Sequence, residues 1–185
     1  MLTRDAIYGA FNRDEIKIKP FKASQLNPNS YDLRLARTLF DVSSPRMCRE
    51  MDVDSEVEYD EILIPDNGFV LEPGHLYLGV TKEWTYTNRY IPMIEGKSTT
   101  ARYGITTHIS AGFGDLSFSG HWTLEIAAVR PVRIYADMRI VQISYYAPTG
   151  MIDITNTYNK RGNYNVEYSE DPKPKLPVPG NLRKG

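Results

Sequence analysis

Short runs in which apolar and polar residues alternate recur along much of the chain. Residues 31–35, 131–135 and 138–145 show this pattern, which is typical of β-strands with one buried face. Turn residues, mainly Asn, Pro and Gly, separate such runs at short intervals. The pattern predicts an all-β, mainly antiparallel fold that closes as a barrel or sandwich.

One segment at the N-terminus has helical spacing instead. Thr3 is suited to cap a helix over residues 3–12, in which Ala6, Ile7, Ala10 and Phe11 form a single apolar stripe. We therefore expect one or two short helices beside the strands.

The stretch from residue 50 to 61 holds seven acids and neither Lys nor Arg. Its acids alternate with Met51, Val53, Val57 and Tyr59, which indicates a strand or an arm with one solvated acidic face. Acids spread along one face do not converge on a point, so we expect no metal site there.

Composition narrows the class of protein. The chain has 185 residues, 41% hydrophobic and 24% charged, with a net charge of −1, which argues against a general nucleic-acid or membrane-surface binder. The single Cys48 excludes an internal disulfide and a cysteine-rich zinc site. With no transmembrane run or signal peptide, a cytoplasmic location is the default expectation.

Most of the candidate functional residues lie between residues 95 and 126. Lys97, Ser98, Thr99 and Arg102 offer cations and hydroxyl groups that suit phosphate oxygens, especially if they open a helix or turn. Glycines at 112, 114 and 120 let the backbone approach a base or sugar closely. Together these residues predict a nucleotide site.

One acid, Glu125, lies within an apolar strand. Alternation places Trp122, Leu124 and Ile126 on one face and Glu125 on the other, beside Thr123. If this carboxyl faces a pocket, lost hydration raises its pKa toward that of a useful proton shuttle. The alternative is a solvent-facing Glu paired with an Arg across the sheet.

This segment resembles the dCTP deaminase branch of the dUTPase-like superfamily, including its bifunctional members. The residues that match the family pattern, with no gap from the Ser to the Glu, are Ser98, Ala101, Arg102, Gly104, His108, Ala111, Gly112, Phe113, Asp115, Phe118, Gly120, Thr123, Leu124 and Glu125. Lys97 and Thr99 replace the family's Arg and Ser, and Gly114 replaces Ile.

The resemblance implies a fold and a division of the chain. The fold would be a distorted, jelly-roll-like dUTPase β-barrel over residues 1–152, with residues 153–185 as a C-terminal lid or tail. Tyr158 and Tyr164 match lid positions of the family, whereas the Lys and second Gln of its lid are missing here.

The resemblance also assigns roles. Glu125 would move the protons, Ser98 and the Ala111 backbone would orient water and base, and Arg102 and Lys97 would bind phosphates, assisted by Thr99. The remaining expected substrate contacts are Gly112, Phe113, Asp115, Gln142, Tyr158 and Tyr164. The alternative for Gln142 is a side chain that satisfies the sheet backbone.

Four functions follow from these residues. The first is hydrolysis of dCTP to dUTP and ammonia without zinc, since one Cys cannot supply the ligand set of a zinc deaminase. The second is the bifunctional reaction that gives dUMP and pyrophosphate. The others are a plain dUTPase, in which Asp115 activates water, and a catalytically silent nucleotide-binding trimer.

The resemblance implies three partners. We expect dCTP as the substrate, Mg²⁺ bound to its triphosphate rather than to protein ligands, and a homotrimer whose subunits share active sites. We expect no nucleic-acid polymer and no membrane as partners.

Overall fold

The computed structural model describes residues 1–43, 51–153, 155–179 and 181. Cys48 and Glu50 lie outside the described residues. The described helices are α1 (Arg4–Asn12), the 3-10 turn η1 (Ala23–Gln25), α2 (Ser98–Arg102) and α3 (Tyr158–Arg161). The described strands are β1 (Ile16–Lys19), β2 (Tyr31–Arg34), β3 (Thr38–Asp41), β4 (Asp60–Leu63), β5 (Phe69–Leu71), β6 (Tyr77–Thr87), β7 (Ile91–Gly96), β8 (Ile105–Thr106), β9 (Ser119–Ala128), β10 (Val132–Ile134) and β11 (Arg139–Tyr146).

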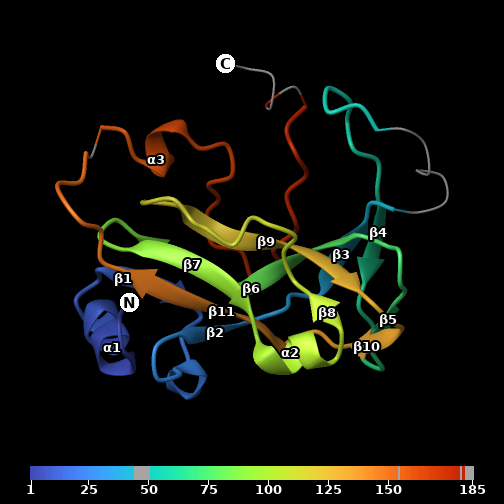
Figure 1. Ribbon diagram of the computed structural model, residues 1–185, viewed down its shortest axis with the longest axis horizontal. Helices are drawn as coiled ribbons and strands as arrows, with labels where there is room; N and C mark the ends of the chain where they lie inside the picture. Colours follow the sequence, from blue (N-terminus) through green and yellow to red (C-terminus); the bar gives the residue numbers. More distant parts are fainter. Residues whose placement is uncertain (44–50, 154, 180, 182–185) are drawn as a thin grey trace.

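The strands pair antiparallel in three sheets (Figure 1). The largest has the order β4-β3-β6-β9-β8, with β1 also paired to β6. A second has the order β2-β11-β7, and β5 pairs with β10. In Figure 1, β2 and β11 pass below β6 and β9. The predicted all-β, mainly antiparallel fold is therefore confirmed.

The core lies between these layers. Leu33, Val141 and Ile143 from the β2–β11 side and Leu124 and Ile126 from β9 belong to one apolar cluster, each at most 1% exposed. Burying a side chain of this size contributes about 1.5–3 kcal/mol. The strand pattern thus defines the outer and inner faces of the barrel.

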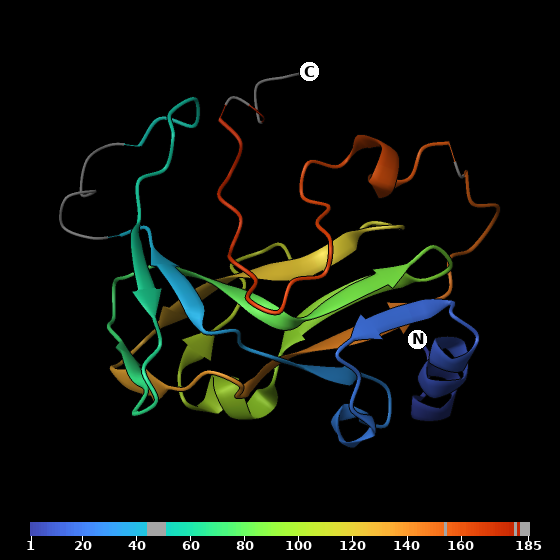
Figure 2. The same ribbon diagram turned by 180° about the vertical axis from the view of Figure 1, so that it is seen from behind.

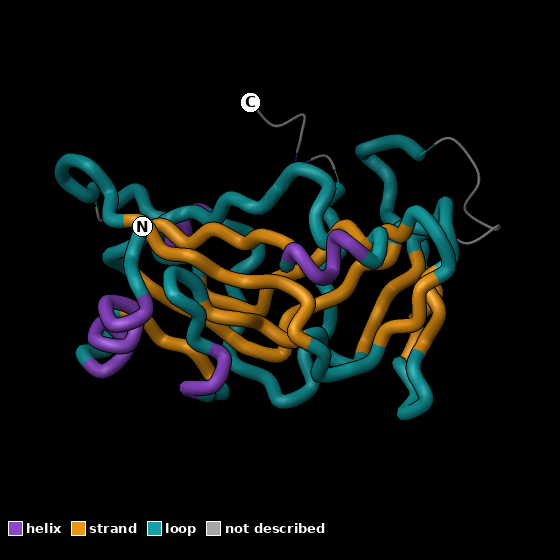
Figure 3. The backbone as a smooth tube through the Cα atoms, turned by 60° about the horizontal axis from the view of Figure 1, so that its bottom comes forward, coloured by secondary structure: helices purple, strands orange, loops and turns teal. Residues whose placement is uncertain are grey.

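Helices are few and peripheral. The predicted N-terminal helix is α1, which buries Ile7 and Ala10; Thr3 is at its N-cap position, without a side-chain capping hydrogen bond. The described residues hold three short α-helices, where we expected one or two. In the tube view α1 and α2 lie at separate places on the outside of the strand framework (Figure 3). No helix among the described residues is long and apolar enough to cross a membrane.

Two segments lie outside the barrel strands. The acidic stretch is an arm rather than a strand until β4 begins at Asp60, and the ring of Tyr59 stacks on that of Phe40 at 4.1 Å. Beyond α3 the tail descends across the sheet and turns back, as the red segment of Figure 2 shows. Arm and tail together border the central part of β9.

Candidate active site

A cavity of about 580 Å³ lies against β9, between the arm and the tail. Its lining comes from the strands, the loop before β9, the arm and the tail, and it is largely apolar. The lining residues are Val42, Ser43, Met51, Val57, Leu76, Leu78, Ala111, Phe113, Gly114, Asp115, Phe118, His121, Trp122, Thr123, Glu125, Tyr158, Tyr164, Lys175 and Pro177. Six of the predicted site residues, Ala111, Phe113, Asp115, Glu125, Tyr158 and Tyr164, meet in this cavity.

Glu125 faces this cavity from β9. Leu124 and Ile126 point to the opposite face and are at most 1% exposed, as the alternation predicts, whereas Trp122, 8% exposed, also borders the cavity. Glu125 itself is half-buried, and none of the ion pairs found in the described part of the chain involves it. The pocket-facing alternative therefore describes this carboxyl.

Burial sets the protonation of Glu125. Lost hydration raises the pKa of its carboxyl above the usual 4.5, while the backbone N–H of Ile109 and the nearby His108 oppose that rise. The Nε2 of His108 in turn lies 3.5 Å from an oxygen of Glu95. A carboxyl with a raised pKa beside a cavity is suited to accept a proton and release it again.

The loop before β9 is held against β7. The N–H of Ile94 donates to the Gly112 carbonyl at 2.7 Å, and the N–H of Gly114 donates to the Pro92 carbonyl at 2.9 Å. A Cβ on Gly114 would collide with the ring of Trp122. The departure from the family's Ile at position 114 is thus matched by a large ring that fills the same space.

The two lid tyrosines lie at the cavity from the tail side. Tyr158, in α3, contacts the ring of Phe118 edge-on at 5.6 Å between centroids. Burial raises the pKa of its phenol, which stays protonated and can donate a hydrogen bond. Tyr164 follows in the next part of the tail. Both tyrosines line the cavity.

The predicted phosphate contacts lie elsewhere in the same chain. Lys97 and Thr99 line a separate depression of about 770 Å³ together with Arg130, Arg133 and Arg139. Ser98 and Arg102, on α2, are exposed and do not line the Glu125 cavity.

Lys97 has a partner within the chain. Its ammonium forms an ion pair with Asp32, whose side chain is only 2% exposed and also accepts from Asn27 at 2.7 Å. Arg139 approaches the other Asp32 oxygen at 3.4 Å. The charge of Lys97 is therefore compensated before any phosphate arrives.

Gln142 lies on β11, where its Oε1 accepts from the hydroxyl of Ser30 at 3.1 Å. This contact ties the side chain to the turn before β2. Gln142 does not line the cavity at Glu125.

Sequence reasoning placed Thr123 beside Glu125 without giving it a role, and it missed two further polar residues that border the cavity, His121 and Lys175. His121 shares a face of β9 with Glu125, and the same alternation that singled out the acid could have found it. Lys175 belongs to the tail, far from β9 in sequence, and no local sequence pattern predicts its place in the cavity. Among the described residues no group of three or more His, Cys, Asp or Glu is placed to hold a metal ion.

The fold and this cavity define a class of protein, an antiparallel β-barrel with a half-buried carboxyl in a largely apolar pocket. The structure resembles that of 2′-deoxycytidine 5′-triphosphate deaminase from Agrobacterium tumefaciens, with a TM-score of 0.62 over 80% of this chain and 22% identity. That likeness concerns the fold, and this chain spans about half the length of the Agrobacterium chain (48%). Residues 1–147 match the family described as dCTP deaminase-like, and the chain belongs to that family.

Curated relatives are more similar in sequence. The chain is 43% identical over 156 residues to a protein of Clostridium botulinum named "dCTP deaminase, dUMP-forming", which covers 84% of this chain and 88% of that protein. A Hathewaya histolytica protein of the same name is 43% identical over 169 residues, covering 91% of this chain and 95% of its own.

Proposed function

We propose that the protein hydrolyses dCTP to dUMP, ammonia and pyrophosphate, consuming two waters. One water replaces the cytosine 4-amino group, and the other attacks the α-phosphorus and releases pyrophosphate. The names of the relatives favour this second of the two product alternatives over dUTP as the end product.

One observation supports the deamination step above all others: Glu125 lies half-buried in the cavity with the pKa of its carboxyl raised by burial. In the proposed step its carboxylate takes a proton from the attacking water as the oxygen bonds to C4, and passes this proton to N3. It then takes the remaining proton from the new C4 hydroxyl and delivers it to the amino group, which leaves as ammonia while the C4 carbonyl forms. A side chain that performs such transfers contributes about 10²–10⁴ in rate.

The neighbouring residues would hold the nucleotide. Asp115 would accept from the sugar 3′-hydroxyl, and the exposed ring of Phe113 would pack beside base or sugar. The buried Gly112 would keep the backbone close to the base, where the Ala111 carbonyl and amide are available. Tyr158 and Tyr164 would cover the nucleotide from the tail.

The phosphate-binding set would come from a second subunit. Ser98, Thr99 and Arg102 lie on α2, outside the cavity that holds Glu125 of the same chain. A homotrimer would bring the α2 of one subunit to the cavity of the next, where Ser98 orients water and Arg102 binds phosphate. Lys97 and Gln142 would assist from the same subunit as that α2. The separation of the two sets supports this arrangement.

Magnesium would enter with the triphosphate. Mg²⁺ keeps several waters and is bound by few protein ligands when phosphates are present, and the carboxylates described here do not form a cluster for it. Zinc is not required in this scheme, because a single Cys and no H-x-E motif leave the zinc-deaminase ligands absent from the sequence.

Product analysis tests the proposal. Purified protein with Mg²⁺ is given dCTP, and ammonia, pyrophosphate, dUTP and dUMP are followed together. We expect dUMP, ammonia and pyrophosphate in equal amounts, and only traces of free dUTP. Accumulation of dUTP would support the single-function alternative, and release of pyrophosphate without ammonia would overturn the deaminase assignment.

A further inference from the structure

The tail is held along β9 by hydrogen bonds at regular positions. The N–H of Val166 donates to the Ser119 carbonyl at 2.8 Å, and the N–H of Lys175 donates to the Thr123 hydroxyl at 2.9 Å. The indole of Trp84, on β6, donates to the Val166 carbonyl at 2.7 Å. Each contact on β9 uses the face that also carries Glu125.

His121 holds the tail between those two points. Its Nε2 lies 3.1 Å from the backbone nitrogen of Ser169, and its Nδ1 lies 3.0 Å from the Thr81 carbonyl. A carbonyl only accepts, so Nδ1 carries the hydrogen; a backbone N–H only donates, so Nε2 is bare. The two contacts together require the neutral ring in one tautomer.

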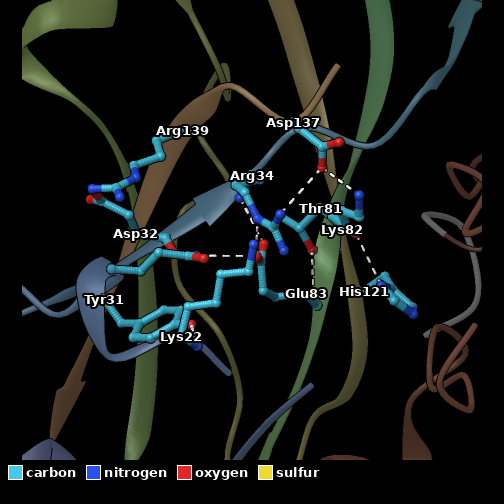
Figure 4. Close-up of polar contacts among 11 residues, drawn as sticks. Lys22, Tyr31, Asp32, Arg34, Thr81, Lys82, Glu83, His121, Asp137 and Arg139 are labelled. Atoms are coloured by element: carbon cyan, nitrogen blue, oxygen red, sulfur yellow. Dashed lines mark hydrogen bonds and ion pairs between the residues drawn. The ribbon is translucent and has the colours of Figure 1, made fainter. Parts of the chain in front are cut away.

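The support beneath His121 is rigid. Thr81 accepts from the N–H of Trp122 at 2.9 Å and donates to the Glu83 carbonyl at 2.8 Å. The Glu83 carboxylate is fully buried and is bonded by Arg34 at 2.6 Å. Figure 4 shows His121 bonded to Thr81 at the edge of this network. The ring is therefore anchored on its strand side, and the contact to the tail is the one that can open.

Opening that contact would change the cavity. The tail segment on either side of Ser169 supplies Tyr164, Lys175 and Pro177 to the lining around Glu125. Gly120 permits this close passage, since a Cβ there would meet Phe118 at 3.0 Å and Val166 at 3.2 Å. The path of the tail and the shape of the cavity are thus set by the same few contacts.

We propose that His121 is a positioning residue, whose bare Nε2 latches the tail at Ser169 over the Glu125 cavity and releases it when the ring takes a proton. The role of the tail in holding substrate rests on the proposed function, whereas the latch itself does not. Once protonated, Nε2 carries a hydrogen that faces the Ser169 N–H, and two donors cannot bond.

The groups around His121 favour the neutral ring in the closed tail. Burial lowers the pKa of the imidazole, opposed by the Thr81 carbonyl and by the charge of Glu83. On β6, Lys82 follows Thr81, and in the tail the ring of Tyr168 lies 6.0 Å from that of His121. The charged groups on the cavity side are Asp115, Glu125 and Lys175. The ring is 6% exposed.

The direction of the pH effect on tail closure follows from the linkage between closure and protonation of His121. An open tail would return water to the imidazole and remove part of the burial that lowers its pKa, so the open state binds more protons than the closed state. Closure is therefore most favoured when the ring is neutral and weakens as the pH falls. The closing equilibrium should be weaker at pH 5.5 than at pH 7.5.

Amide hydrogen exchange of the substrate-free protein tests the latch. After correction for intrinsic rates, residues 163–175 of the wild type should lose protection from pH 7.5 to 5.5. The variants His121→Gln and His121→Asn should show no such pH dependence, because neither side chain titrates. A variant that keeps the wild-type pH dependence would overturn the proposal.

A second pair of variants leaves β9 untouched. Ser169→Pro removes the N–H that His121 accepts, and the tail should lose protection at pH 7.5 to the level of the wild type at pH 5.5 or below. Ser169→Ala keeps that N–H and should keep the protection. Unchanged exchange of β11 amides verifies that the barrel is folded. Wild-type tail protection in Ser169→Pro would refute the latch.

Kinetics then connect the latch to catalysis. An open tail reduces the fraction of protein competent to bind, so Ser169→Pro should raise KM for dCTP about tenfold while kcat changes little. If exchange shows the latch but dCTP is not deaminated, the proposed function fails and the latch stands. If deamination occurs but KM and tail exchange are insensitive to these variants, the latch fails alone.

Discussion

The two regions that carry the predicted chemistry are built in opposite ways. The Glu125 cavity is deep, largely apolar and covered by the chain's own tail. The α2 region is a shallow basic surface on which Ser98, Thr99 and Arg102 are exposed. In the cavity, the surroundings that raise the pKa of Glu125 come from one chain. In the α2 region, the hydrogen-bond donors face solvent.

This difference is the basis for the proposed sharing of sites between subunits. A buried acid gains its raised pKa from its own barrel, and no neighbour is needed for that. Phosphate donors must stay accessible until a triphosphate arrives, and exposed positions on a short helix satisfy that need. Variants in each region should therefore fail in different ways.

The largest effect is expected from Glu125→Gln. The amide keeps the size of the side chain but cannot carry protons, so kcat for ammonia release should fall by about 10²–10⁴ while dCTP still binds. Stopped-assay ammonia measurement and nucleotide titration check both points. The exposed Glu72→Gln is the matched control and should retain wild-type rates. Deamination at the wild-type rate by Glu125→Gln would exclude the assigned base.

The next largest effect is expected from Arg102→Ala. Loss of a charge-assisted phosphate contact should lower kcat/KM by about 10- to 100-fold without lowering the melting temperature. Both parameters are measured on the purified variant.

Refolding two variants together tests whether Glu125 and Arg102 act in one site from different subunits. If sites are shared, equal amounts of subunits carrying Glu125→Gln and Arg102→Ala, refolded together, should recover about a quarter of wild-type activity, because about a quarter of all interfaces then join both native residues. Each variant refolded alone supplies the baseline. Recovery no greater than that baseline would place both residues in a site within one subunit.

The smallest effect on catalysis and a clear effect on stability are expected from Asp32→Asn. It leaves Lys97 and Arg139 without their shared, buried counter-charge, which should cost about 1–3 kcal/mol. Thermal unfolding checks this, at about 2–4 °C per kcal/mol for a chain of this size. The fully exposed Asp66→Asn, also beside an Arg, should leave the melting temperature unchanged.

Local patterns predicted much of the fold. Alternation located β9, β2 and β11 and placed Glu125 on the correct face of its strand, because side-chain direction in a strand depends only on position. Residues 77–87 form one strand, β6, whose pairing with β9 shifts register between Val80 and Trp84, and no local pattern marks that irregularity.

Contacts distant in sequence were not predictable. Nothing near Lys97 shows that Asp32 would take up its charge, and nothing in β9 shows that Ser169 would dock on His121. These pairs depend on how β2 and the tail pack against the barrel, which no local pattern encodes. The roles of Ser98, Thr99, Arg102 and Gln142 stay predictions for the same reason.

The exposed ion pair between Lys173 and Glu61, at 2.7 Å, joins the tail to the strand that follows the acidic arm. Dissolved ions weaken this link between the two borders of the cavity, because at physiological ionic strength the screening length is about 8 Å. The apolar packing of Val57 from the arm and Leu176 from the tail against one cluster does not depend on salt in this way, so concentrated salt should loosen the two borders only slightly.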